Sequence, residues 1–394
     1  NGESKCELHA LSSACYDILN IESATGPLIF TYAKQKPEIR YPIIIKNDFC
    51  LFFSSNDKEQ PNIRLYLSCP GHNLSMNFEL STYVLSIHTT FLTAIDGDFN
   101  VHSFGKFSAS YLKSIRCTEE PVHIMNKVSE VNLDKMYYSV GFMINAIHFL
   151  TVYRLFRSIK LKSHVYVRVV SVIQEKPKFD KLMKEYKIGQ IYENKKINYT
   201  IMYQTEFQVE LFKNILGNEN KFVEIYFSDG NYVDKGHLIN KDDLFYNAQQ
   251  ISTYYYENTI PICDSINKGN WDLVSKIVRN LADETVTDME VSTLSLNDLS
   301  IDDIRFDNRR MYNQFKIYHI IRIPRLLIKI VYSSLNATQE VVFHTANDPY
   351  MTEIDMYNLM YNRVQPENGL CRNLGLCRDE YPQFLDAKKG LTYC

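Results

Sequence analysis

The chain has 394 residues, 45% of them hydrophobic and 23% charged, which is the composition of a folded globular protein and excludes a chain disordered throughout. Its 43 Lys and Arg residues against 46 Asp and Glu give a formal net charge of −3, so a strongly basic nucleic-acid binder of the histone or ribosomal type is excluded. The length allows two or three domains, at roughly 150 residues for each domain.

The first hundred residues are predicted to form a small β domain. Short runs of β-branched and aromatic residues occur at 41–46, 50–54, 63–68 and 83–88, and turn-rich pieces separate them. We place this domain at residues 1–115. The sequence contains neither an internal repeat nor a low-complexity tract, which excludes a solenoid.

From Ser139 onward the pattern changes to a mixture of strands and helices. Predicted strands cover 164–173, 222–228, 315–323 and 326–333. Predicted helices cover 206–216, 242–253 and 270–283, and the last of these has the clearest amphipathic spacing. This mixture favours an α+β domain in which helices pack against a mixed or antiparallel sheet. We assign it to residues 116–394.

Three features indicate a secreted, extracellular protein. Glycosylation acceptor sequences occur at Asn73, Asn198 and Asn336. The chain begins at Asn rather than Met, as after removal of a signal peptide. The sequence has no run of 18 apolar residues, so we expect no membrane association.

The nine cysteines lack the paired spacing of metal ligands, so we expect disulfides rather than zinc. The odd number leaves at least one thiol outside any pair. Cys394 is expected to pair with Cys371 or Cys377, because the three lie together at the C-terminal end. The sequence leaves the remaining connectivity and the oligomeric state open.

Charge is unevenly distributed along the chain. Residues 154–198 contain twelve Lys and Arg against four Asp and Glu, whereas residues 280–304 contain seven acids and no Lys or Arg. One interpretation is that two solvated faces balance each other. The other is a basic track that follows a phosphate backbone, with interleaved aromatic rings as stacking surfaces. On the second interpretation the nucleic-acid-binding residues are Arg154, Arg157, Lys160, Lys162 and Arg168.

The residues most typical of a catalytic site lie between Asp234 and Arg279. Asp234-Lys235-Gly236-His237 is followed by Asn258, and then by Asn267-Lys268-Gly269-Asn270-Trp271 at the start of the last helix. A histidine at a strand end can remove a proton from water. An Asn carbonyl can hold a hydrated Mg²⁺, and an Arg on the helix can stabilise the charge that develops on a phosphate. This order of residues predicts a one-metal phosphodiesterase.

This segment resembles the DNA/RNA non-specific endonucleases with the ββα-metal (His-Me finger) site, in the secreted arthropod branch that includes salivary nuclease-like proteins. The signature of that family is Asp-Arg-Gly-His, then Asn-x-x-Pro, then Asn-x-Gly-x-Trp entering a helix that bears Glu and Arg. Weaker similarity lies at Ser68-Cys69-Pro70-Gly71, from Ile323 to Tyr350 and from Lys389 to Cys394. The resemblance implies a ββα-metal nuclease domain behind the N-terminal β domain.

The resemblance also implies roles for individual residues. His237 would be the general base, Asn267 the ligand of Mg²⁺ (or of Mn²⁺ as a substitute), Arg279 the phosphate-stabilising group and Asn258 a supporting residue. Lys235 stands where the family has Arg, so it keeps the charge and loses the two-pronged guanidinium.

One further position departs from the family in a way that bears on catalysis. Ser275 stands where the family has the Glu that orients the water shell of the metal, and a hydroxyl carries no charge for that task. Asp272, three residues earlier, is a carboxylate that could partly replace it. Loss of one preorganised polar group from such a site costs on the order of 10²–10³ in rate.

The expected function is therefore sequence-non-specific binding of DNA and RNA, with at most weak Mg²⁺-dependent endonuclease activity. Two alternatives stay open. The protein could be a fully active secreted Mg²⁺-dependent endonuclease, in which Asp272 or water restores metal binding. It could also be a pseudo-nuclease whose groove binds another polyanion or a host protein.

Overall fold

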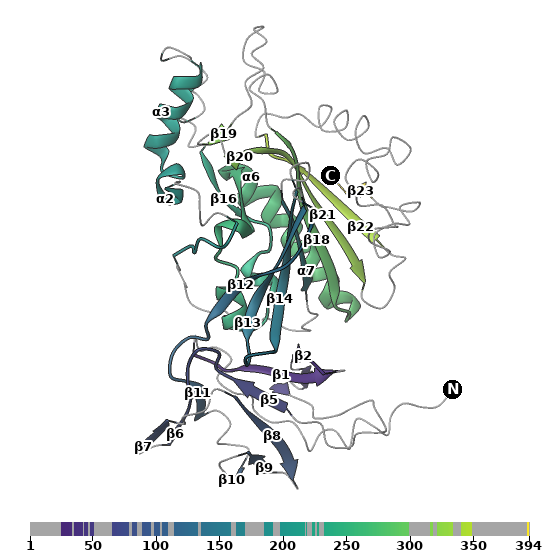
Figure 1. Ribbon diagram of the computed structural model, residues 1–394. Helices are drawn as coiled ribbons and strands as arrows, with labels where there is room; N and C mark the ends of the chain where they lie inside the picture. The colour runs from purple at the N-terminus through teal and green to yellow at the C-terminus, as the bar shows by residue number, and fades with distance from the viewer. Residues whose placement is uncertain are drawn as a thin grey trace, which may run out of the picture.

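The computed structural model (Figure 1) describes residues 25–33, 35–41, 43–45, 48–50, 65–78, 81–84, 89–95, 98–102, 105–108, 114–132, 135–158, 163–169, 185–191, 198–216, 218, 223–224, 227, 232–298, 316–317, 321–333, 340–348 and 392–393. These residues form an N-terminal β module and a larger body, which is built on an eight-stranded sheet.

The N-terminal module contains two antiparallel sheets and a hairpin. The six-stranded sheet has the order β10-β9-β8-β5-β1-β2, and the three-stranded sheet has the order β11-β6-β7. The strands are β1 (Leu28–Ala33), β2 (Lys36–Ile39), β3 (Ile43–Ile45), β4 (Asp48–Cys50), β5 (Leu65–Ser68), β6 (Leu74–Phe78), β7 (Ser81–Val84), β8 (Thr89–Ile95), β9 (Asp98–Val101), β10 (Gly105–Ser108) and β11 (Ile115–Cys117).

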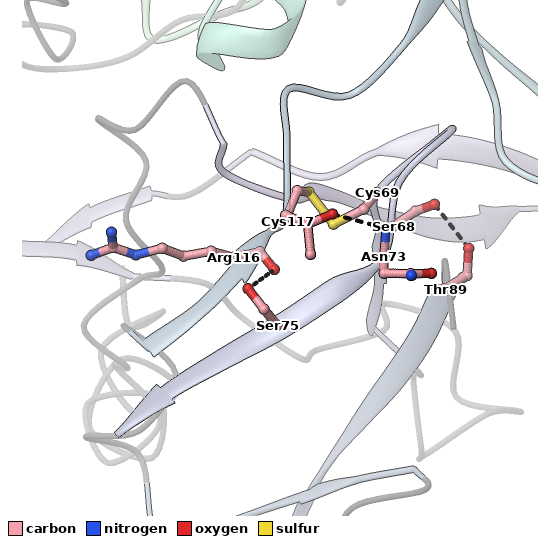
Figure 2. Close-up of a disulfide and its surroundings, with 8 residues drawn as sticks. Ser68, Cys69, Asn73, Ser75, Thr89, Arg116 and Cys117 are labelled. Atoms are coloured by element: carbon pink, nitrogen blue, oxygen red, sulfur yellow. Dashed lines mark hydrogen bonds between the residues drawn. A yellow bond between two sulfur atoms is a disulfide. The ribbon is translucent and has the colours of Figure 1, made fainter. Parts of the chain in front are cut away.

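A disulfide between Cys69 and Cys117 joins the turn after β5 to the end of β11 (Figure 2). Next to it, the Ser75 hydroxyl donates to the Arg116 carbonyl, and the Ser68 and Thr89 hydroxyls bond to each other at 2.8 Å. β11 pairs with β6, so the three-stranded sheet includes the chain as far as Cys117. The predicted pairing of Cys394 lies outside the described residues.

The module docks on the body through an apolar cluster. Leu28 and Phe30 of β1 pack against Phe142, Leu150 and Ala248 of the body. Beside this cluster the ring of Tyr41 stacks on Tyr246, and the Tyr246 hydroxyl donates to the Arg40 carbonyl at 2.5 Å. The N-terminal module therefore contacts the segment that contains the short helix 247–251.

The large sheet of the body has the order β12-β13-β14-β15-β18-β21-β22-β23, antiparallel except for the pair β22–β23. Its strands are β12 (His123–Asn132), β13 (Lys135–Met143), β14 (Phe149–Ser158), β15 (Ser163–Val169), β18 (Met289–Asp298), β21 (Pro324–Ser333), β22 (Glu340–Ala346) and β23 (Thr392–Tyr393). A two-stranded piece, β19 (Lys316–Ile317) with β20 (Ile321–Arg322), completes this part of the chain.

The two faces of this sheet are covered differently. On one face, strand residues such as Val167 and Leu327 pack against Val274 and Val278 of helix α7 (Asp272–Thr285) to form the main core. Because successive side chains of a strand point to opposite faces, the residues between them lie on the other face, where Leu326 and Ile328 form a second cluster. The expected α+β class is thus confirmed.

The remaining elements lie in the body, between β15 and β18 in the sequence. They are α2 (Tyr199–Met202), α3 (Thr205–Leu216), β16 (Val233–His237), a 3-10 turn (Lys241–Asp243), α5 (Asn247–Ile251), a 3-10 turn (Tyr256–Asn258), β17 (Thr259–Cys263), α6 (Asp264–Ile266) and a π-helical turn (Asn267–Trp271) that continues into α7. No helix among the described residues is both long and apolar enough to cross a membrane.

The prediction of a strand at 222–228 is wrong for the residues that the structure describes. Val223, Glu224 and Phe227 have helical backbone. Val223 and Phe227 are four residues apart, so a helical turn places both on one side, and both pack in the cluster that contains Phe212 of α3. Tertiary packing thus overrides the β preference of this short run.

Candidate active site

The Asp-Lys-Gly-His segment forms an antiparallel hairpin that leads into a helix. β16 pairs with β17 in a register that sets Lys235 opposite Pro261 and His237 opposite Thr259. Gly236 leaves room for this pairing, because an added Cβ would lie 2.4 Å from the Cγ2 atom of buried Ile262. From β17 the chain passes through α6 and the π-helical turn into α7. Two strands and a helix therefore meet at the end of β16.

A pocket of about 300 Å³ lies at this meeting point. It is lined by His237, Asn240, Asn267, Lys268, Trp271 and Asp272. The indole Nε1 of buried Trp271 donates to the His237 carbonyl at 3.0 Å, which fastens the start of the helix to the end of β16. The fold thus brings together His237 and Asn267, the predicted base and the predicted metal ligand.

His237 is partly buried among tyrosines. Its Nε2 lies 3.3 Å from the Tyr186 hydroxyl, and the ring centroids of Tyr186 and Tyr254 lie 5.5 Å and 5.4 Å from its own. Burial lowers the pKa of His237 to about 4; the positive charges of Lys241 and Lys235 add to this shift, and Asp243 opposes it. The imidazole is therefore neutral at pH 7 and can accept a proton, but the Tyr186 hydroxyl competes with water for Nε2.

Ser275 faces the large sheet rather than the pocket. It is 1% exposed; its hydroxyl donates to the Trp271 carbonyl at 3.1 Å and accepts from the Lys329 ammonium at 3.0 Å. The hydroxyl proton is thus used inside the helix, and the oxygen meets a positive charge. The pKa of Lys329 is lowered by burial, and the nearby Asp243 opposes this shift without cancelling it.

Arg279 is bound to a buried carboxylate. Its Nη1 donates to Asp243 Oδ1 at 2.9 Å. The other oxygen of Asp243 accepts from the Asn240 backbone N–H at 3.2 Å and lies 3.8 Å from the Lys329 Nζ. One nitrogen of the guanidinium is therefore used in an ion pair with a buried carboxylate. Arg279 is not among the six residues that line the pocket.

Asn258 acts as a brace inside the fold. It is fully buried; its Oδ1 accepts from the Ile239 N–H, and its Nδ2 donates to the carbonyls of Ile239 and Thr253. These bonds fix the loop that follows His237 against the start of β17. The predicted supporting role thus corresponds here to positioning of the loop.

Lys235, which stands at the family's Arg position, is held by aromatic rings. Its Nζ lies 5.2 Å from the ring centroid of Tyr186 and 4.9 Å from that of Tyr203. Contacts of this kind between an ammonium and ring faces are favourable. Lys235 is absent from the residues that line the pocket.

The donor atoms of the pocket fit a hydrated Mg²⁺ poorly. Asn267 offers a neutral amide oxygen, and Asp272 Oδ2 accepts from Lys276 at 2.6 Å. Ser275 has no charge and is bonded to Lys329. Among the described residues there is no group of three or more His, Cys, Asp or Glu side chains that could hold a metal ion. A hard divalent cation would lack the negatively charged oxygens that it prefers.

Two residues of the predicted basic track, Arg154 and Arg168, point away from the face of the sheet that α7 covers. Arg154 lies between Tyr153 and Leu155, whose side chains belong to the core that α7 covers, so Arg154 points to the opposite face of the sheet. The same alternation in β15 puts Arg168 on that opposite face, where it pairs with Asp288.

The other members of that predicted track are described less fully or not at all. Arg157 belongs to β14, but its side chain lies outside the described residues. Lys160 and Lys162 lie outside the described residues altogether. Binding of nucleic acid by the five basic residues stays a prediction.

The sequence assigned no role to Asp243 or Lys329, and it gave Tyr186 only as one of the aromatic rings interleaved in the basic segment. One signal was present: Lys329 is the single charged residue within the apolar run of β21 after Arg325. A lysine at the inward phase of a buried strand requires a partner, because a buried charge without one is costly. Tyr186 carries no comparable signal, since its contact with His237 depends on folding across 51 residues.

Comparisons with known proteins identify the family of this chain. The model of the DNA/RNA non-specific endonuclease family matches residues 178–394. A salivary endonuclease of Lutzomyia longipalpis is 26% identical over 202 residues, which are 50% of this chain and 44% of that protein. The chain therefore spans less than half the length of this relative.

One similar solved structure is described as the EndoG/EndoGI complex and the mechanism of EndoG inhibition. Its sequence is 14% identical to that of this chain. The match covers 68% of this chain and 89% of that one, with a TM-score of 0.33. Nucleases of the matched family typically depend on a divalent metal ion. The family model covers more than half of the sequence, including the hairpin, the pocket and helix α7. The chain belongs to the DNA/RNA non-specific endonuclease family.

Proposed function

We propose that this protein is a secreted, sequence-non-specific binder of DNA and RNA, with a degenerate ββα-metal nuclease site and at most weak Mg²⁺-dependent endonuclease activity. The observation that carries the proposal is the environment of Ser275. At the position where the family has a Glu, a buried hydroxyl is bonded to the Lys329 ammonium and to a helix carbonyl. No carboxylate at this position is left to orient water in the pocket.

The parts that remain support a weak hydrolytic reaction. Neutral His237 can take a proton from a water molecule in the pocket. Its low pKa makes it a poor base, because proton transfer is most efficient when the pKa of the base lies near the working pH. Arg279 can offer its remaining N–H groups to a phosphate, although Asp243 holds one edge of the guanidinium.

Secretion is supported by separate observations. The Cys69–Cys117 disulfide is typical of an oxidising compartment, and a relative is named as a salivary endonuclease. Two glycosylation acceptor residues lie in the described part of the chain: Asn73 is partly exposed, and exposed Asn198 caps α2. The third, Asn336, lies outside the described residues.

The test is a comparison of binding and cleavage on the same protein. DNA and RNA of mixed sequence should shift in a native gel, with an affinity that falls as salt rises because counterions are released from phosphates. Micromolar protein with Mg²⁺ should nick plasmid slowly. His237→Ala should abolish this nicking, which separates it from cleavage by a contaminating nuclease.

Two results would favour the alternatives. Turnover as fast as that of an ordinary secreted nuclease would show a fully active enzyme, and the degenerate-site reading would be wrong. Absence of nucleic-acid binding at physiological salt would instead favour a pseudo-nuclease that binds another polyanion or a host protein.

A further inference from the structure

Lys329 is a charged residue in the middle of the main core. It lies in β21 on the face that α7 covers, between Leu327 and Val331, and its side chain is 1% exposed. Among the described residues, three polar or aromatic groups contact its ammonium. They are the Ser275 hydroxyl at 3.0 Å, an Asp243 oxygen at 3.8 Å and the Trp271 ring, whose centroid is 4.9 Å away.

The buried charges around Lys329 do not cancel. Asp243 is a single carboxylate, and it is shared by two cations, because Arg279 Nη1 lies 2.9 Å from its other oxygen. We call Lys329, Asp243 and Arg279 the buried cation cluster. Its formal charge is positive, because two cations share one carboxylate. In an interior of low dielectric such a charge acts over longer distances than it would in water.

The buried cation cluster adjoins the pocket through Trp271. Trp271 lines the pocket and contacts the Lys329 ammonium with its ring. Ser275 lies one helical turn further on and bonds to the same ammonium. The position that carries a negative charge in the family's pattern is therefore neutral here, and a positive charge touches it.

We propose that the Ser275–Lys329 pair reverses the electrostatic preference of this pocket, so that it disfavours a divalent cation and accepts a nucleic-acid phosphate without one. This inference rests on the proposed function and names the residue that replaces the metal's positive charge. Lys329 acts here as a positioning and electrostatic residue behind the pocket wall, since Trp271 lies between it and the pocket.

The experiment uses four forms of the whole chain: the native protein, Ser275→Glu, Lys329→Met and the double variant S275E/K329M. Mn²⁺ binding is measured by electron paramagnetic resonance of the free ion, without nucleic acid. The double variant should bind Mn²⁺ at least tenfold more tightly than the native protein, because a negative charge then lies behind the pocket wall in place of a positive one. Ser275→Glu alone should gain much less, because Lys329 would pair with the new carboxylate.

Lys329→Met alone should raise Mn²⁺ affinity severalfold, whereas the matched control Lys213→Met, on the exposed side of α3, should leave it unchanged. Thermal unfolding of each variant checks that the fold is kept, and methionine is chosen because it fills the volume of the lysine stem. Native protein that binds Mn²⁺ as tightly as the double variant would overturn the inference. So would Ser275→Glu and the double variant having equal affinity.

A second readout separates this inference from the proposed function. The native protein should bind DNA equally well in EDTA and in Mg²⁺. Binding that requires Mg²⁺ would contradict the inference but leave a nucleic-acid binder. Absence of binding in both buffers would contradict the proposed function itself, and the Mn²⁺ titrations of the four forms would still report on Lys329.

Discussion

The hydroxyl of Tyr186 lies 3.3 Å from Nε2 of His237, so the predicted general base already has a hydrogen-bond partner before any substrate arrives. Tyr186 also packs against Tyr254 and Tyr256, with ring centroids 5.3 Å away in each case, which fixes the position of its ring. Removal of this one hydroxyl would leave the aromatic packing in place and release the imidazole nitrogen to water.

Tyr186→Phe should therefore raise the residual rate of plasmid nicking severalfold, because an acceptor nitrogen of His237 becomes available to a water molecule. The rate is measured at saturating plasmid. Tyr256→Phe is the matched control, since it removes a hydroxyl from a ring that contacts Tyr186. A lower rate in Tyr186→Phe would instead assign the hydroxyl a productive role in orienting the imidazole.

The stability of the protein should depend on pH through two histidines, His237 and His344. Burial lowers the pKa of His237 and of His344 to about 4, from an ordinary value of 6.5. Between these values the unfolded chain binds more protons than the folded one, so the free energy of unfolding falls as the pH is lowered from about 6.5 toward 4 and is level above that range. Each histidine contributes on the order of 1–3 kcal/mol to this loss.

The check is chemical denaturation at a series of pH values, with His344→Gln as the variant. His344 lies in β22, opposite Ile328, so His344→Gln leaves the pocket residues unchanged. This variant should show a shallower fall than the native protein between pH 6.5 and 4. A native unfolding energy that stays constant over this range would contradict the lowered pKa of both histidines.

Parts of this structure could be predicted from sequence because they depend on local spacing. The predicted helix at 206–216 corresponds to α3 (Thr205–Leu216), and the predicted helix at 270–283 to α7 (Asp272–Thr285). His237 and Asn267 were expected in one site, and both line the pocket. The predicted helix at 242–253 is split into a 3-10 turn and α5, since the extended backbone of Leu244 ends the first turn early.

The rest depends on strand register between distant segments, which local spacing does not encode. Lys329 is 54 residues from Ser275, and only the position of β21 under α7 brings them together. The same long-range order places Arg154 and Arg168 on the face of the sheet away from α7, although the sequence groups them with the site's charges. For these two arginines, a place in the basic segment of the sequence is therefore not a place beside the pocket.

If Arg154 and Arg168 contact phosphates, the double variant R154A/R168A should bind DNA more weakly at low salt. The slope of the logarithm of affinity against the logarithm of salt should fall by roughly 2, because about one counterion is released for each phosphate contact. Lys213→Ala, on exposed α3, is the matched control. An unchanged slope would remove these two residues from the nucleic-acid-binding surface.

Loss of the disulfide should destabilise the N-terminal module. The double variant C69A/C117A removes a link across 48 residues, and a link of this kind contributes about 2–4 kcal/mol. Calorimetry should show an earlier transition for the module. Reducing agent should lower the transition of the native protein in the same way and leave C69A/C117A unaffected; an equal response of both would point to other cysteines.

Asp243 and Asp272 provide a matched pair of carboxylates near the pocket, one buried and one exposed. The Asp243 side chain is 1% exposed and stands between Arg279 and Lys329, so Asp243→Asn leaves two buried cations without their carboxylate and should cost about 3–5 kcal/mol. Asp272 is bonded to Lys276 on the surface of α7, with side chains 34% and 60% exposed, and Asp272→Asn should cost less than about 1 kcal/mol. Urea unfolding measures the free energy of unfolding of both variants.

Because the cost of Asp243→Asn comes from unpaired cations, Lys329→Met in the same chain should recover part of it. Failure to recover any would show that Arg279 alone requires Asp243, and that Lys329 is held in the core by Ser275 and Trp271.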